Sequence, residues 1–230
     1  MSSGGGEPRP RAESPLGGVV VFVCVLAGAL GLGALVARLA SPAVHDRYLP
    51  WILGRGLGLA AYLTLFSLTM LGLWYRHPLR VRHPVLHPET TLRLHAALAS
   101  ASVVLLTGHL VSLASDSYAG VGWAGALVPG RSAYRTVPVA IGVASFWLLL
   151  GVVVSARLGA RIGRLGWHHL HQLALLAFCG AFVHGIEAGT DTAALRVGYG
   201  LTGLAVVALW WTSRTATTAP HRELEGTGAK

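Results

Sequence analysis

Six runs of apolar residues, separated by short polar segments, organise the chain. They cover residues 17–39, 51–75, 92–115, 134–155, 165–188 and 193–213. Each run is close to the roughly 20 residues that an α-helix needs to cross the hydrocarbon core of a bilayer. The pattern predicts an all-α fold, an integral membrane bundle of six transmembrane helices that occupies residues 16–213.

The two ends of the chain lie outside this bundle. Residues 1–15 are rich in glycine, serine, proline and charge, which is too polar to build a core, and we expect a disordered tail there and over residues 214–230. The first apolar run is longer than the roughly 7 to 15 residues of a signal-peptide core. We therefore expect it to be retained as a membrane anchor.

Composition and charge agree with a membrane protein. The chain is 53% hydrophobic and 12% charged, with a mean hydropathy of +0.58, outside the range of ordinary soluble domains. The net charge of +9 could indicate nucleic acid, but 12 of the 18 Lys and Arg residues fall on one side of the predicted bundle. By the positive-inside rule that side, with both termini, is cytoplasmic. We expect a multi-pass protein of the plasma membrane, in contact with lipid and without a nucleic acid partner.

Two of the apolar runs each carry a pair of widely spaced histidines. The run at 92–115 carries His95 and His109, and the run at 165–188 carries His171 and His184. Ionisable side chains are costly in hydrocarbon, so each is a candidate functional residue. Neutral imidazole is a usual nitrogen ligand of haem iron, and one histidine from each of two helices at a common depth would hold a haem edge-on between them.

The depths of these histidines match between the two runs, which cross the predicted membrane in the same direction. With a rise of about 1.5 Å per residue, the step from His95 to His109 spans about 21 Å and the step from His171 to His184 about 19.5 Å. We name His95 and His171 the inner pair, and His109 and His184 the outer pair, after their predicted depths. One such histidine is more often a packing residue, but four at matched depth favour the axial ligands of two stacked haems.

The angular positions leave one inner ligand open. Fourteen residues bring His109 within about 40° of the face of His95, whereas thirteen leave His184 about 140° from His171 on an ideal helix. His169, fifteen residues before His184, falls within about 60° of it. His169 is therefore a second candidate for the inner ligand.

Two further features bear on such a site. Arg55 lies in the first turn of the second run, where it is either an interfacial arginine reaching the headgroups or a partner for an anionic group such as a haem propionate. His77, His83 and His87 each precede a proline, which favours extended backbone. We expect these three in a solvated cytoplasmic loop.

Short motifs surround the histidines. They are LH at 94–95, GH at 108–109, GW…PGRSAYR over 122–135, and WHHLHQL over 167–173 followed by VHGIEAGTD. In these motifs the chain resembles the ferric reductase-like transmembrane domain family, which includes the membrane part of NADPH oxidases and the haem subunit of the bacterial methionine sulfoxide reductase system. The resemblance covers residues 54–192 and is closest to short bacterial members that lack a flavin domain.

The resemblance implies a protein with two haem b groups. In that family the ligands are spaced by 14 and 13 residues, which here selects the inner and outer pairs and makes His168 and His169 bystanders. The family more often has a basic residue directly after the first ligand and at the position of His168, where this chain has Ala96 and His168. We expect Arg93 or Arg164 to neutralise the propionates of the inner haem instead.

The expected function is electron transport across the membrane. Two axial histidines on each haem leave no open position on iron, which disfavours substrate binding at the metal. Since no G-x-G-x-x-G or P-loop pattern lies in the predicted cytoplasmic segments, we expect a ferric reductase-like oxidoreductase component that takes electrons from a separate flavin reductase or from quinol. The acceptor would be Fe(III), oxygen or an extracytoplasmic partner protein. The alternative is a membrane transporter or proton pathway that uses the histidines as relays.

Overall fold

The computed structural model describes residues 48–81, 86–158 and 163–218, together with residues 20, 23, 24, 27, 28, 31 and 161. This part of the chain is helical and contains no strand, which confirms the predicted all-α class. The apolar run at 17–39 lies mostly outside the described residues, and the expected tail at 1–15 lies wholly outside them. The first of the six spans therefore stays a prediction.

Five long helices account for the other apolar runs. Each is long and apolar enough to cross a membrane by length and composition, as in a multi-pass membrane protein. The largest difference from the predicted bounds is at the last helix, which continues to Thr218. The five are α2 (Leu49–Arg76), α3 (Pro88–Ser115), α5 (Thr136–Arg157), α7 (Arg164–Ala188) and α8 (Thr192–Thr218), and the short helices η2 (Pro78–Val81) and α4 (Gly122–Leu127) lie in connections.

Local chemistry sets the two ends of α3. Pro88 occupies the first turn, where its missing N–H leaves no helical hydrogen bond unmade. At the other end the Asp116 carboxylate accepts the backbone N–H groups of Tyr118 and Ala119 at 3.2 and 3.0 Å. This aspartate turn ends the helix and leads the chain into α4.

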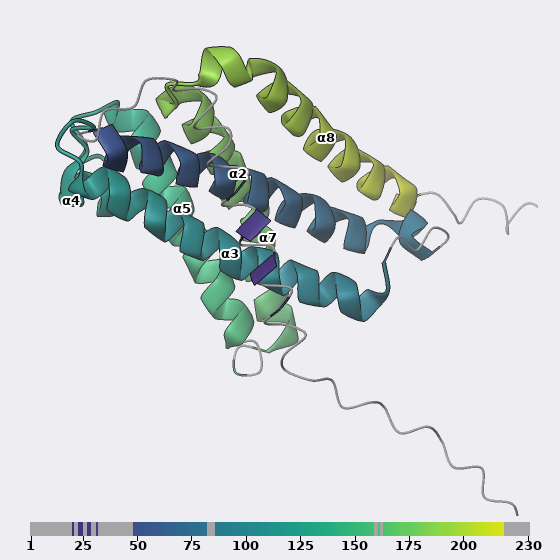
Figure 1. The fold of residues 1–230 in the computed structure, drawn as a ribbon. Helices are drawn as coiled ribbons and strands as arrows, with labels where there is room; N and C mark the ends of the chain where they lie inside the picture. The colour runs from purple at the N-terminus through teal and green to yellow at the C-terminus, as the bar shows by residue number, and fades with distance from the viewer. Residues whose placement is uncertain are drawn as a thin grey trace, which may run out of the picture.

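The long helices pack as two pairs that cross each other (Figure 1). α2 lies along α3, and α5 lies along α7. Gly54 and Gly58 on α2 are so close to α3 that an added Cβ would come within 2.7 and 2.8 Å of its side chains. Gly142 on α5 is similarly close to α7, at 2.5 Å. Small residues are common at helix contacts in membranes because they allow this approach.

An apolar cluster fills the region where the two helix pairs cross. Each of the four helices contributes a buried side chain: Leu65 from α2, Leu98 from α3, Leu149 from α5 and Phe178 from α7. Phe178 stands about midway between the two site histidines of α7. The cluster therefore lies between the depths of the inner and outer pairs.

The last helix, α8, lies against α2 and α7. The hydroxyls of Tyr62 on α2 and Thr202 on α8 are 2.5 Å apart, and the Tyr62 ring meets the Tyr199 ring edge-on at 5.1 Å. Leu201 and Leu204 are 62% and 66% exposed. In a bilayer such apolar side chains face lipid.

His77 departs from the expectation of a solvated loop, because it is only 4% exposed. Its ring stacks on Trp74, and its Nδ1 accepts the backbone N–H of Leu79 at 3.1 Å. Its Nε2 lies 3.3 Å from the Thr212 hydroxyl on α8. For His77 the sequence interpretation is wrong: the residue closes the end of α2 against α8.

We expect Leu105→Ala to lower the free energy of unfolding by about 2–5 kcal/mol. Leu105 is 1% exposed and packs against Ala60 and Ala61 of α2, so truncation leaves a cavity. Leu201→Ala is the matched control, with an expected change within about 0.5 kcal/mol. Denaturant unfolding of the protein in detergent, followed by circular dichroism, measures both, and equal losses would contradict this packing.

Candidate functional site

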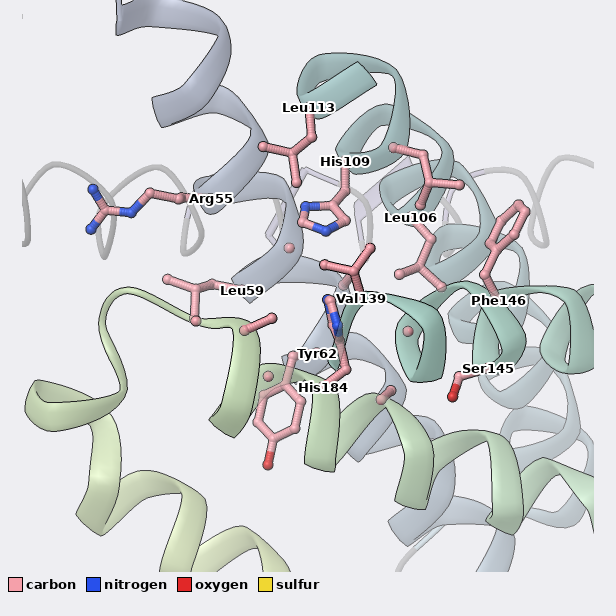
Figure 2. Close-up of a pocket in the computed structure, with 18 of the residues that line it drawn as sticks. Arg55, Leu59, Tyr62, Leu106, His109, Leu113, Val139, Ser145, Phe146 and His184 are labelled. Atoms are coloured by element: carbon pink, nitrogen blue, oxygen red, sulfur yellow. The ribbon is translucent and has the colours of Figure 1, made fainter. Parts of the chain in front are cut away.

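His109 on α3 and His184 on α7 face each other across the bundle (Figure 2). Their ring centres are 6.4 Å apart and their planes are inclined by 77°. Both side chains are half-buried, and both line one cavity. The structure therefore brings together the two residues that the sequence places at the outer depth.

A backbone carbonyl of the neighbouring helix holds each outer imidazole. His109 Nδ1 donates to the carbonyl of Gly54 at 2.7 Å, and His184 Nδ1 donates to that of Pro138 at 2.8 Å. A carbonyl oxygen only accepts hydrogen bonds, so Nδ1 carries the proton in both rings. Each Nε2 then keeps the lone pair that a metal ligand needs.

His95 and His171 form a second facing pair, with ring centres 5.9 Å apart and planes inclined by 54°. Trp167, one turn before His171, stacks on its ring at 5.1 Å. The Nδ1 of His171 is buried and has no hydrogen-bond partner among the described residues. A buried polar atom left unpaired costs free energy, so a nitrogen of this ring is available to a ligand.

The facing partner of His95 is His171, and His169 is exposed. On an ideal helix His171 and His184 point about 140° apart, yet each faces a histidine of α3. The two helix pairs cross (Figure 1), and two helices that cross meet different sides of each other at their two ends. The crossing supplies the geometry that ideal helical spacing does not.

A cavity of about 390 Å³ surrounds the outer pair. This volume is typical of sites for small molecules and cofactors. Neither inner histidine lines it. Its other walls are mainly apolar and come from all four crossing helices, with Leu59, Leu106, Val139, Phe146 and Ala181 among them.

The separations within both pairs fit two ligands on opposite sides of one metal ion. A metal to imidazole nitrogen bond is about 2 Å long and the ring centre lies about 1 Å further, so such rings are centred about 6 Å apart. The distances here are 5.9 and 6.4 Å. The described residues contain no group of three or more His, Cys, Asp or Glu that could hold a bare metal ion. A porphyrin supplies its own equatorial ligands, so the separation within each pair is the one that a haem would need.

Arg55 lies at the edge of this cavity, where Asp191 holds it. Its Nε donates to Asp191 Oδ2 at 2.9 Å and its Nη2 donates to Oδ1, a bidentate arrangement. The guanidinium also lies over the Trp51 ring, 4.3 Å from the centroid. Figure 2 shows it directed away from the imidazoles. The Asp191 carboxylate therefore occupies the position beside Arg55 that a haem propionate was expected to take.

Arg93 and Arg164 are the two arginines expected near the propionates of the inner haem. Arg93 is half-buried on α3, two residues before His95, and two residues correspond to about 200° of rotation. The helix therefore turns Arg93 away from the face that carries His95. Arg164 begins α7, and its side chain lies outside the described part of the chain.

Three contributors to the site escape the sequence analysis. Gly58 lies against the imidazole of His109 and Gly142 against that of His184. In the sequence, the GxxxG spacing of Gly54 and Gly58 is the one signal, and it indicates the first contact alone. Asp191 ends the last of the quoted motifs, but its partner lies 136 residues away in sequence. Local patterns do not reveal contacts of that range.

Ser102 is a further residue that sequence analysis does not identify. It stands on α3 seven residues from each site histidine of that helix, and two turns place all three on one face. It is fully buried, and its hydroxyl has no hydrogen-bond partner within the described ranges. A polar atom therefore lies midway between the two pairs.

Comparisons of the chain with protein-family models, with curated proteins and with solved structures find no match. The family resemblance stays a prediction.

We expect Arg55→Ala and Asp191→Ala each to lower the free energy of unfolding, and the double variant to lose less than their sum. The side chains are 13% and 16% exposed, so removing one leaves a poorly solvated charge. The expected coupling is about 0.5–3 kcal/mol, measured by a double-mutant cycle in detergent. The exposed Arg131→Ala is the control, and additive losses would show that the pair does not act together.

Proposed function

We propose that this protein is a membrane di-haem b protein that carries electrons across the plasma membrane to an extracytoplasmic acceptor, in the manner of ferric reductase-like proteins. The observation that carries the proposal is the pairing of four histidines on α3 and α7, with ring centres 5.9 and 6.4 Å apart at two depths. A bound haem would supply one-electron transfer, and a histidine pair holding its iron would leave no position open for substrate.

The residues of the chain bind and orient such groups. Each pair offers one imidazole from α3 and one from α7. The carbonyls of Gly54 and Pro138 fix the tautomer and direction of the outer rings. The walls of the cavity are mainly apolar, and the polarity around a bound haem would be one determinant of its reduction potential.

Basic residues support the direction of transfer. We propose that the inner pair lies at the cytoplasmic side, where the positive-inside rule puts most Lys and Arg residues. Electrons enter there from a separate flavin reductase or from quinol, and leave near the outer pair to Fe(III) or a partner oxidoreductase. The described arginines at the inner end are Arg76, Arg80, Arg93, Arg157, Arg161, Arg164 and Arg214. Those at the outer end are Arg131, Arg135 and Arg196, together with Arg55, which is paired with Asp191.

Histidine variants test the pairing. We expect the purified protein to be red with two haems per chain, and any single alanine variant of the four histidines to lose about half of the haem, because each haem needs both axial ligands. His109→Ala/His184→Ala should lose no more than either single change. His109→Ala/His171→Ala should lose both haems. Haem extraction assays against protein concentration measure the content.

His169→Ala is the matched control on the same helix, and we expect it to keep both haems because the side chain is exposed. Loss of haem in His169→Ala but not in His171→Ala would move the inner ligand to His169. A colourless wild-type protein with full helical content would overturn the haem proposal and favour a transporter or proton pathway.

Transmembrane electron transfer should require both pairs. We expect liposomes containing the protein to reduce trapped ferricyanide when dithionite is added outside, and the rate to fall to that of protein-free liposomes when either pair is replaced by alanine. The pairs lie about 20 Å apart in depth, so one haem alone leaves most of the membrane uncrossed. A variant without the outer pair that still reduces the trapped acceptor would contradict this path.

A further inference from the structure

Each imidazole of the outer pair lies against a glycine of the neighbouring helix. In both cases the glycine comes four residues after the residue whose carbonyl accepts the imidazole N–H. The arrangement occurs on two different helices, α2 and α5. The two sets are Gly54, Gly58 and His109, and Pro138, Gly142 and His184.

A side chain at either glycine would displace the ring. A Cβ added at Gly58 would lie 2.8 Å from His109 Nδ1, and one added at Gly142 would lie 2.5 Å from His184 Nδ1. In an α-helix the Cβ points back toward the carbonyl four residues earlier, which is why serine hydroxyls reach that carbonyl. A methyl group there would stand between the imidazole N–H and its acceptor.

The inner pair lacks the full arrangement. A Cβ added at Gly72 would come nearest to Cε1 of His95, at 3.2 Å, so this ring has to move by only a few tenths of an ångström. His171 Nδ1 has no hydrogen-bond partner among the described residues. Ser155 on α5 corresponds to His171 as Gly142 corresponds to His184, because it lies thirteen residues after Gly142 and His171 lies thirteen residues before His184. Its hydroxyl donates to the carbonyl of Val152 at 2.7 Å.

We infer that Gly58 and Gly142 are positioning residues for the outer haem. By having no side chain they let His109 and His184 donate Nδ1–H to a helix carbonyl, which fixes Nε2 of both rings toward the gap between them. The inference rests on the proposed function and concerns the outer haem alone.

The two hydrogen bonds also have an electronic consequence. Donation from Nδ1 raises the basicity of the coordinating nitrogen, and a more basic axial ligand favours ferric over ferrous iron. The bonds therefore hold the reduction potential of the outer haem low. Breaking either one should raise that potential and leave the inner haem unchanged.

Alanine variants of four glycines test the inference. Gly58→Ala and Gly142→Ala remove the proposed positioning, whereas Gly72→Ala should shift the His95 ring only slightly and leave the outer haem unaffected. Gly151→Ala is the control on α5, since nothing lies within 4 Å of its added Cβ. Redox titration of the haem absorbance, with His109→Ala to identify the inner component, measures both potentials. Circular dichroism checks the helical content.

We expect Gly58→Ala and Gly142→Ala to raise the outer potential or to lose that haem alone, and Gly151→Ala to match the wild type. Two haems with unchanged potentials in both variants would overturn the inference and leave the proposed function standing. A wild-type protein without haem would defeat the proposed function itself.

A second measurement covers the case in which the alanine variants do not fold. Nitrogen NMR of the wild-type protein, labelled at histidine and free of haem, reports which ring nitrogen carries the proton. We expect two histidines with a protonated, hydrogen-bonded Nδ1. Spectra in which every histidine carries its proton on Nε2 would overturn the inference.

Discussion

The hydrogen bond from an imidazole to a carbonyl of the neighbouring helix is the contact on which the outer half of the site depends. A helix carbonyl keeps a second lone pair after it accepts its own helical hydrogen bond. An imidazole of a neighbouring helix reaches that lone pair only where no side chain covers the backbone. His109 is held in this way by α2 and His184 by α5. Contacts within each helix pair orient the ligands, and the crossing of the two pairs sets the gap between them.

Elsewhere in the described interior, polar groups are paired either within one helix or with a neighbouring element. Hydroxyls such as those of Thr64 and Ser145 donate to carbonyls of their own helix, and Arg55 and Asp191 satisfy each other. In an apolar surrounding each unsatisfied polar atom is costly. His171 Nδ1 and Ser102 Oγ are the exceptions nearest the site. Hydrogen bonding is thus least complete at the inner pair and midway between the pairs.

The sequence predicts the helices well because about 20 apolar residues have few structural options in a membrane protein. It also identifies the four histidines, since charge-bearing groups in such runs stand out. It does not predict the burial of His77, which depends on α8 arriving beside the end of α2. Nor does it predict that Gly142 meets His184, because the register of α5 against α7 is set by packing between the two helices. Ideal helical angles also ignore the crossing of the pairs, so they do not place His171 and His184 both toward α3. Contacts between distant segments leave no local pattern.

The side chains between the inner and outer histidine pairs bear on whether the protein carries electrons or protons. A proton relay needs a chain of hydrogen-bonding groups, whereas electron transfer between cofactors does not. The imidazoles within each pair are centred about 6 Å apart with no hydrogen bond joining them in the described part of the chain. Between the two depths lie Leu65, Leu98, Leu149 and Phe178, and on the ligand face of α3 the single hydroxyl of Ser102. Facing imidazoles separated mainly by apolar side chains therefore support our proposal of electron transfer between two haems over a relay of protons along the histidines.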